Sequence, residues 1–412
     1  MNRSRLQHAA ACGFLLCFLA TVIPARSAAD DRWVASWAAV PDSAGPPLQA
    51  QTVRQVIRTS LGGSSLRIRL SNLFGTGPVI IGPVHVALHD DDSAIVSGSD
   101  HALTFDGKSV VTVAKGDSVL SDPVKMEVKA LQELAVSLYL PTHTGPTTIH
   151  GIALQTAYIT RTGDATAAKV FPVGETLENR FFLTDVEVLS SADDHAIVII
   201  GDSITDGVGS TEDSNRRWPD ALAARLQGDP ALASIAVVNA GISGNRILND
   251  GAGPPFIGPS VLSRFDRDAL SQPGVHWILF MAGINDISAA GILATPKDHV
   301  SAQQIIDGMK VLIARAHKKG TKMWGATLLP FNNIKGLAHL EGAEAKRQTV
   351  NAWIRTAGKF DAVADFDRVI RDPAHPTRFL PAFDSGDHLH PNDAGYAAMA
   401  ASLDLRLFNQ DK

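Results

Sequence analysis

The chain has 412 residues, 45% of them hydrophobic, a formal net charge of −5 and two cysteines. This acidic balance argues against nucleic acid or an anionic membrane as a partner. Both cysteines, Cys12 and Cys17, lie within the first 29 residues. The rest of the chain is therefore expected to form no disulfide, no cysteine-ligated metal site and no cysteine nucleophile.

Residues 1–29 have the pattern of a secretory signal peptide. Arg3 and Arg5 precede an apolar stretch, residues 9–23, and small residues follow at 27–29. The stretch is too short to span a bilayer comfortably, and a retained anchor is the alternative. Loss of the segment with its three arginines would lower the formal charge from −5 to −8. We therefore expect a secreted or periplasmic protein. No stable membrane insertion is expected, because no later apolar run approaches membrane-spanning length.

Residues 33–188 show a period of two. Apolar and polar residues alternate in Ser65–Ser71 and in Glu133–Leu140, which predicts half-buried antiparallel strands. Glycine-containing turn sequences punctuate the stretch, and no amphipathic helix is evident. The pattern predicts an N-terminal β-rich domain over residues 30–190, an all-β fold of sandwich or jelly-roll type.

The sequence indicates little about what this β-rich domain does. Trp33 and Trp37 are suited to stacking on sugars, but at this spacing they are better interpreted as interface or core anchors. Five histidines show no metal-ligand spacing, so surface or loop positions are expected: His85, His89, His101, His143 and His150. Two hypotheses stay open, a carbohydrate-binding module and a platform that frames the active site.

Beyond residue 190 the pattern changes to alternating strands and helices. Buried strands are predicted at residues 196–200, 235–239, 276–282, 322–328 and 362–366. Helices are predicted at residues 218–226, 301–318, 344–357 and 392–407. This alternation predicts an α/β domain over residues 191–412, a three-layer α/β/α sandwich with flavodoxin-like strand order.

Chemically useful residues follow the predicted strands. Ser203 comes after the first strand, Gly244 after the second and Asn285 after the third, while Asp387 and His390 precede the last helix. The carboxyl ends of parallel strands lie at one edge of the sheet, where ligands bind. We therefore expect these residues to converge there. For Ser203 alone, the alternative is an N-cap serine that opens the next helix.

This inventory suits acyl transfer. Ser203 is the candidate nucleophile, His390 the base and later the acid, and Asp387 the group that fixes the histidine tautomer. The backbone amides of Ser203 and Gly244 and the Asn285 side chain are candidate oxyanion donors.

Four blocks of this sequence resemble the SGNH subgroup of the GDSL esterases and lipases. They are Gly201-Asp202-Ser203, residues 239–244, Gly283-Ile284-Asn285-Asp286, and Asp387-His388-Leu389-His390-Pro391. Isoleucine stands at 204, where the name-giving leucine is expected. The resemblance covers residues 196–408, slightly more than half of the predicted mature chain. It implies that Gly244 is the oxyanion glycine, although Gly241 stays possible.

Neighbouring polar residues are assigned supporting roles. The pair His388 and His390 is not interpreted as a metal site, because no third ligand stands at a characteristic spacing. Asp202 and Asp206 are expected to stabilise turns, and Asp286 to brace its loop. For Arg246, contact with an anionic or sugar substrate and a structural role are equally good hypotheses.

The sequence therefore predicts a secreted serine esterase that uses no metal or organic cofactor and acts on a small-molecule or polysaccharide ester. A carbohydrate acetyl esterase or short-chain acylhydrolase is favoured by the expected export and the added β-domain. The alternatives are a lysophospholipase, lipase or thioesterase and, in another class, a non-catalytic carbohydrate-binding protein. Nothing in the sequence indicates an oligomeric state.

Overall fold

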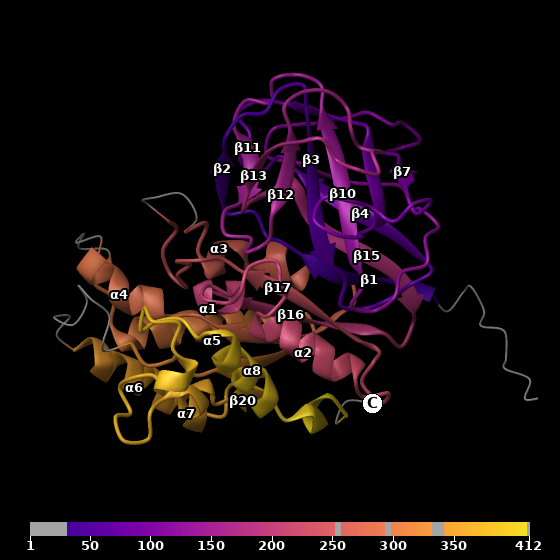
Figure 1. Cartoon of the computed structure of the whole chain (residues 1–412). Coiled ribbons are helices and arrows are strands. Elements are labelled where there is room, and N and C mark those ends of the chain that lie inside the picture. Colours follow the sequence, from indigo (N-terminus) through magenta and orange to yellow (C-terminus); the bar gives the residue numbers. More distant parts are fainter. Residues whose placement is uncertain (1–30, 252–256, 293–297, 332–341, 410–412) are drawn as a thin grey trace, which may run out of the picture.

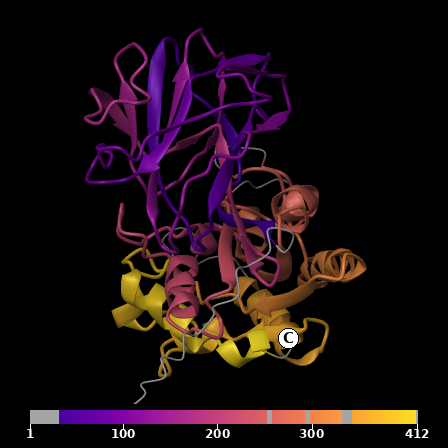
Figure 2. The same ribbon diagram turned by 90° about the vertical axis from the view of Figure 1, so that its right-hand side faces the viewer.

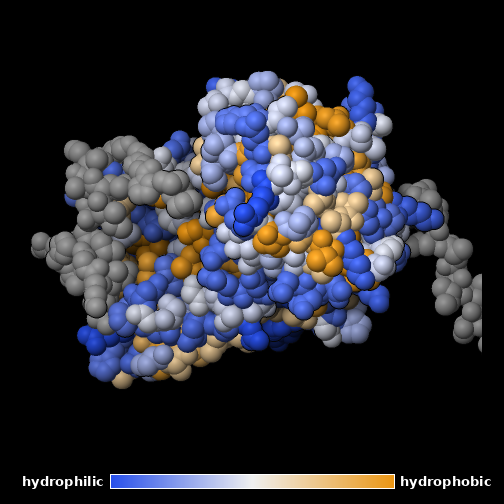
Figure 3. Space-filling model, turned by 45° about the horizontal axis from the view of Figure 1, so that its top comes forward, coloured by the Kyte–Doolittle hydropathy of each residue, from blue (hydrophilic) through white to orange (hydrophobic). Residues whose placement is uncertain are grey.

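The computed structural model describes residues 31–251, 257–292, 298–331 and 342–409, so the predicted signal peptide lies outside the described residues. A β-part stands on an α/β-part, and the turned view shows the same stacking (Figures 1 and 2). Within the described ranges, no helix has the length and apolar character that crossing a membrane requires. Hydrophobic residues on the face in Figure 3 form small patches among hydrophilic ones.

Residues 31–191 form antiparallel sheets and contain no helix, so the predicted all-β fold is confirmed. One sheet has the order β1 (Asp31–Ala38), β15 (Leu183–Ser191), β4 (Ser65–Ser71) and β9 (Ser118–Leu120). The second has β13 (Val173–Leu177), β12 (Ala157–Thr160), β3 (Gln51–Arg58), β10 (Glu133–Leu140), β6 (Val84–Leu88) and β7 (His101–Leu103). Smaller sheets join β14 (Arg180–Phe181), β11 (Thr147–His150) and β2 (Ser43–Gly45), and β5 (Val79–Ile81) with β8 (Val111–Val113).

The two larger sheets share one hydrophobic core, as a β-sandwich requires. In β4 the predicted alternation is confirmed, because Leu66, Ile68 and Leu70 are buried between more exposed polar residues. The prediction of a half-buried strand is wrong for β10, which is buried on both faces. Its outer face is covered because Arg54 binds the Ser137 hydroxyl there and is itself held by the carbonyl of Thr166.

The second half contains a five-stranded parallel sheet. Its order is β17 (Ile235–Gly241), β16 (His195–Gly201), β18 (Val275–Met281), β19 (Lys322–Ala326) and β20 (Ala362–Ala364). In chain order this is 2-1-3-4-5, which confirms the flavodoxin-like prediction. β15 ends at Ser191 and β16 begins at His195, and the predicted domain boundary between them stays a prediction.

Helices cover both faces of this sheet because successive strand residues point to opposite sides. Ile197 and Ile199 of β16 pack with α2 (Trp218–Gln227), α7 (Phe366–Ile370) and α8 (Asp393–Ser402). Val198 and Ile200 pack with α3 (Val261–Phe265), α5 (Ala302–Lys318) and α6 (Ala343–Thr356). Among the described residues, the remaining helical segments are α1 (Ser203–Asp206), a π-turn (Asp266–Leu270), α4 (Ile284–Ile292) and two 3₁₀ turns (Pro381–Phe383 and Leu405–Asn409).

The β-part packs against β17, the edge strand of the parallel sheet (Figure 1). The Val237 amide on this edge donates to the Ser60 hydroxyl at 2.9 Å. Ala35 of β1 likewise donates to the Pro273 carbonyl at 2.9 Å. The β-part thus covers a sheet edge that would otherwise offer unpaired backbone groups. Buried residues of both parts also belong to one continuous hydrophobic core.

Candidate active site

Ser203 lies where β16 turns sharply into α1. The strand ends at Gly201, Asp202 caps the helix by accepting from the Ile204 amide at 3.1 Å, and Ser203 is the first helical residue. The interpretation of Ser203 as the N-cap is therefore wrong, because Asp202 occupies that position. The turn needs glycine at 201, where a Cβ would lie 2.3 Å from the Thr205 hydroxyl and 2.5 Å from the Met281 carbonyl.

Ser203, His390 and Asp387 form one chain of hydrogen bonds. The Ser203 Oγ lies 2.8 Å from His390 Nε2, and His390 Nδ1 lies 2.5 Å from Asp387 Oδ2. Since the Asp387 carboxylate can only accept, Nδ1 must carry a proton and Nε2 is free to accept from the serine hydroxyl. This is the arrangement that a serine nucleophile, a histidine base and an orienting carboxylate require.

Asp387 is fixed by its own loop as well as by His390. Its Oδ1 accepts from the backbone amides of Leu389 and His390, each at 2.8 Å. Partial burial raises the pKa of Asp387, but the hydrogen bond to the His390 ring and the two amides outweigh burial and lower that pKa below its ordinary value. These bonds therefore favour the ionised carboxylate, although its side chain is 47% exposed.

The candidate oxyanion donors differ in how their N–H groups are used. Gly241 donates its amide to the Asn239 side chain at 2.9 Å. The amides of Ser203 and Gly244 have no hydrogen-bond acceptor among the described residues. Gly244 has a φ of 75°, which only glycine adopts readily. Between the two glycines that the sequence left open, these observations favour Gly244.

Asn285, the third candidate donor, lies at the start of α4 and donates its side-chain amide to the Asn245 carbonyl at 3.1 Å. This bond holds Asn285 against the loop that carries Gly244. Asp286 accepts from the amides of Ile247 at 2.8 Å and Leu248 at 3.1 Å. It therefore braces the loop that carries Gly244, whereas the sequence led us to expect that it braces its own loop.

Arg264 on α3 ties several strand ends together, and the sequence did not point to it. Its guanidinium donates to the carbonyls of Gly201 and Ala240 and to the Asn245 side chain at 2.8–3.0 Å. It thereby joins the ends of β16 and β17 to the loop after β17. An arginine among ordinary helix residues carries no local signal of such a role, because all three partners are distant in sequence.

Buried carboxylates surround the start of α1. Burial raises the pKa of Asp202 to about 7 and that of Asp286 to about 6. Asp206 does stabilise a turn, as predicted, since it accepts from both the amide and the hydroxyl of Ser243.

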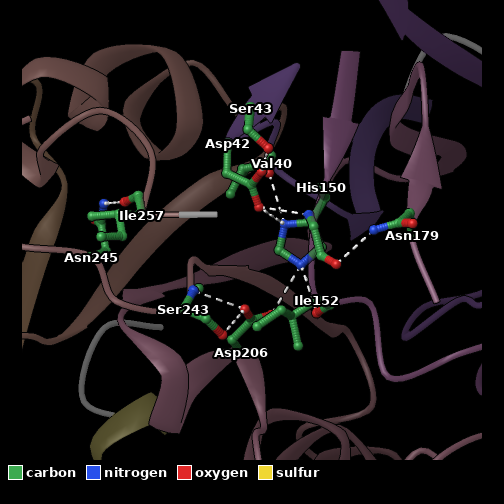
Figure 4. Close-up of polar contacts among 12 residues, drawn as sticks. Val40, Asp42, Ser43, His150, Ile152, Asn179, Asp206, Ser243, Asn245 and Ile257 are labelled. Carbon is green, nitrogen blue, oxygen red and sulfur yellow. Dashed lines mark hydrogen bonds and ion pairs between the residues drawn. The ribbon is translucent and has the colours of Figure 1, made fainter. Parts of the chain in front are cut away.

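The prediction for His150 is wrong. It is a buried residue of β11 and pairs with Asp206 of the α/β-part rather than lying at the surface or in a loop (Figure 4). Two other histidines of the β-part, His85 and His89, contact the carboxylates of Asp100 and Glu133 inside that part, each at 2.8 Å.

Arg246 has a structural position. It is 2% exposed, pairs with Asp298 at 2.5 Å and donates to the Asp250 carbonyl at 2.6 Å. Of the two hypotheses for Arg246, these contacts support the structural role and not contact with an anionic or sugar substrate. His388 pairs with Asp384 at 2.6 Å, and no group of three or more potential metal ligands occurs in the ranges that the structure describes.

Part of the chain matches a known protein family. Residues 199–398 match the GDSL-like Lipase/Acylhydrolase family. No curated protein matches the chain. Solved structures similar to it include a GDSL-like lipase from Bacteroides thetaiotaomicron, with 18% identity over 52% of this chain and 88% of that chain and a TM-score of 0.37.

Two further solved structures have comparable likeness. An acetylxylan esterase from Geobacillus stearothermophilus has 18% identity over 52% of this chain and 93% of that chain, with a TM-score of 0.37. A carbohydrate acetylesterase family member from Sinorhizobium meliloti has 18% identity over 51% and 95%, with a TM-score of 0.40. The matched family segment contains all five predicted site residues. The site geometry thus lies within the segment, residues 199–398, that matches the GDSL-like Lipase/Acylhydrolase family.

Proposed function

We propose that the protein is a serine esterase that hydrolyses carboxylic esters through an acyl-enzyme. The hydrogen-bond chain from Ser203 Oγ to His390 Nε2 and from His390 Nδ1 to Asp387 carries the proposal. A serine hydroxyl is a weak nucleophile unless a base removes its proton, and His390 is within reach to do so.

In the first half-reaction the Ser203 oxygen bonds to the ester carbonyl carbon while its proton moves to His390 Nε2. The carbonyl π electrons become the oxyanion, which accepts from the Ser203 and Gly244 amides and the Asn285 side chain. Collapse of this intermediate breaks the bond to the alcohol oxygen, and that oxygen takes the proton from His390. The alcohol leaves and the acyl group stays on Ser203.

In the second half-reaction water replaces the alcohol. His390 takes a proton from the water as its oxygen bonds to the acyl carbon, and a second oxyanion forms at the same donors. Collapse breaks the bond to Ser203 Oγ, which regains a proton from His390, and the carboxylic acid is released. Asp387 keeps the His390 ring oriented and stabilises the imidazolium in both halves.

For the substrate we propose an acetyl or other short-chain ester on a carbohydrate. The support is the predicted export of the chain and its second, β-rich part, since extracellular polysaccharide is a source of acetyl esters that an exported enzyme meets. Hydrolysis of lysophospholipids or thioesters uses the same catalytic groups and is the alternative outcome of the substrate test.

The test is a substrate panel with purified protein lacking residues 1–29: aryl acetate and longer aryl esters, acetylated xylan, lysophospholipid and acyl-CoA. We expect acetate release from the aryl ester and from the glycan. Long-chain lysophospholipid as the preferred substrate, with no acetate released from glycan, would contradict the carbohydrate assignment but leave the esterase. Ser203→Ala should abolish turnover, whereas Ser214→Ala, at an exposed serine of the following loop, should not.

A further inference from the structure

A buried charged network joins the two parts of the molecule (Figure 4). At its centre is His150, the last residue of β11, which is 6% exposed. Its Nδ1 lies 2.9 Å from the Val40 carbonyl and 3.5 Å from Asp42 Oδ2. Its Nε2 lies 3.0 Å from Asp206 Oδ1 and 3.1 Å from the Ile152 carbonyl.

Each of these four partners can only accept a hydrogen bond or attract a positive charge. Both ring nitrogens of His150 must therefore carry protons, which makes the ring an imidazolium. Burial alone would lower the pKa of His150, but Asp206 and then Asp42 outweigh it and raise that pKa to about 9. His150 is thus a fixed cation at neutral pH, held between one carboxylate from each part of the chain.

The carboxylate of Asp206 passes this link on to the catalytic loop. Its Oδ1 faces His150, while its Oδ2 accepts from the Ser243 amide at 2.9 Å and the Ser243 hydroxyl at 2.6 Å. Asp206 is the last residue of α1, the helix that begins with Ser203. Ser243 directly precedes Gly244. Asp206 therefore belongs to the helix that begins with the candidate nucleophile. Its carboxylate contacts both His150 of the β-part and Ser243, the neighbour of the candidate oxyanion glycine.

We infer that His150 is a positioning residue for the oxyanion loop, so that the β-part completes the active site rather than being a separate accessory module. The inference rests on the proposed esterase function. Of the two roles that the sequence left open for the β-part, a carbohydrate-binding module and a platform that frames the active site, the inference favours the platform.

Burial of the network explains why His150 matters for the loop. Asp206 is 4% exposed, so its charge depends on the nearby His150 cation far more than on contact with bulk solvent. Without His150, Asp206 would either take up a proton or move toward solvent, and both changes weaken its bonds to Ser243. Functional groups must be held to within about 0.5 Å of their productive geometry, and the loss of one oxyanion donor lowers kcat by about 10²–10³-fold.

The effect should appear in kcat more than in KM. Oxyanion donors act on charge that develops in the transition state, whereas binding of the neutral ester needs them little. A purely structural defect would instead reduce the amount of folded protein, which lowers the apparent kcat in proportion to the unfolded fraction seen by circular dichroism.

The experiment compares full-length His150→Gln with His85→Gln, corrected for folded fraction. His85 is the matched control, since it also pairs with an aspartate but lies within the β-part. We expect His150→Gln to lose at least tenfold in kcat with KM changed less than threefold, and His85→Gln to keep wild-type kinetics. Wild-type kcat in His150→Gln, with turnover still dependent on Ser203, would overturn the inference alone. Absence of any Ser203-dependent turnover in the wild type would overturn the proposed function and the inference with it.

A double-mutant cycle tests the route through Asp206. If His150 acts through the Asp206–Ser243 contact, adding Ser243→Ala to His150→Gln should lower kcat by less than threefold further. Effects that multiply would contradict the route. Should His150→Gln fail to fold, Asp42→Asn decides. Among the described residues, the Asp42 carboxylate accepts hydrogen bonds from Ser43 and Gly151 and pairs with His150. A selective loss of kcat in Asp42→Asn supports the inference, and unchanged kcat overturns it.

Discussion

Replacement of Asp387 by asparagine tests the direction of the hydrogen bonds in the catalytic chain. Asp387 Oδ1 accepts from two backbone amides, and Oδ2 accepts from His390 Nδ1 at 2.5 Å. An asparagine that keeps the two amide bonds must turn its NH₂ toward Nδ1. The His390 ring would then carry its proton on Nε2 and could no longer accept from Ser203.

The expected loss follows from this change of tautomer. Such a substitution in a serine triad lowers kcat by about 10⁴-fold. Because the Asp387 side chain is 47% exposed, water can relieve part of the mismatch, and we expect about 10³-fold, or roughly 4 kcal/mol of activation free energy. Asp387→Ala should be milder than Asp387→Asn, since it imposes no tautomer.

Asp384→Asn is the matched control in an initial-rate assay with aryl acetate. Asp384 makes the same set of contacts three residues earlier, to the His388 ring and to the amides of Gly386 and His388. We expect its kcat to stay within threefold of wild type. Equal kcat values for Asp387→Asn and wild type, or equal losses for both variants, would refute the tautomer argument.

Three further predictions concern stability and geometry. Arg246→Met should lower the free energy of unfolding in urea by about 3–5 kcal/mol, because it removes the buried guanidinium that pairs with buried Asp298; an unchanged urea midpoint, like that expected for exposed Arg406→Met, would contradict the structural role. Gly241→Ala places a Cβ 2.4 Å from the Asp206 amide, so about 1–3 kcal/mol of stability and much of kcat should be lost, whereas Gly77→Ala, with open space around it, should behave as wild type. The raised pKa of Asp202 means that the folded state holds its proton more tightly than the unfolded state, so this residue's contribution to stability falls as pH rises from about 4 to 7. Asp202→Asn should remove that fall. The unfolding free energy of the variant minus that of wild type should therefore increase from about pH 4 to pH 7, and a pH-independent difference would contradict the raised pKa of Asp202.

The sequence was informative where local pattern determines structure. Continuous apolar runs such as residues 196–200 predicted the parallel strands, and the alternation in Ser65–Ser71 predicted β4. Asp387 and His390 stand three residues apart, so their pairing needs only a local turn. The end of the last helix was less accurate: α8 stops at Ser402 and a 3₁₀ turn follows from Leu405, because Leu403 adopts an extended conformation.

The sequence was uninformative where partners are distant and ordinary in type. His150 meets Asp206 across 56 positions, and Arg264 reaches Gly201 across 63. Neither residue stands in a motif, because each acts by filling a buried position that only the packing of several strands creates. The covered outer face of β10 has the same origin, since Arg54 and the Thr166 carbonyl meet only after the chain folds.

The central claim is that Ser203 is the nucleophile of an ester hydrolase. Its most direct test is reaction of the full chain with a fluorophosphonate ester, followed by intact-protein and peptide mass spectrometry. We predict one adduct per chain, on the peptide that contains Ser203, with turnover lost in step with labelling and no adduct in Ser203→Ala. An adduct on another residue, or ester hydrolysis that persists in fully labelled protein, would contradict the claim.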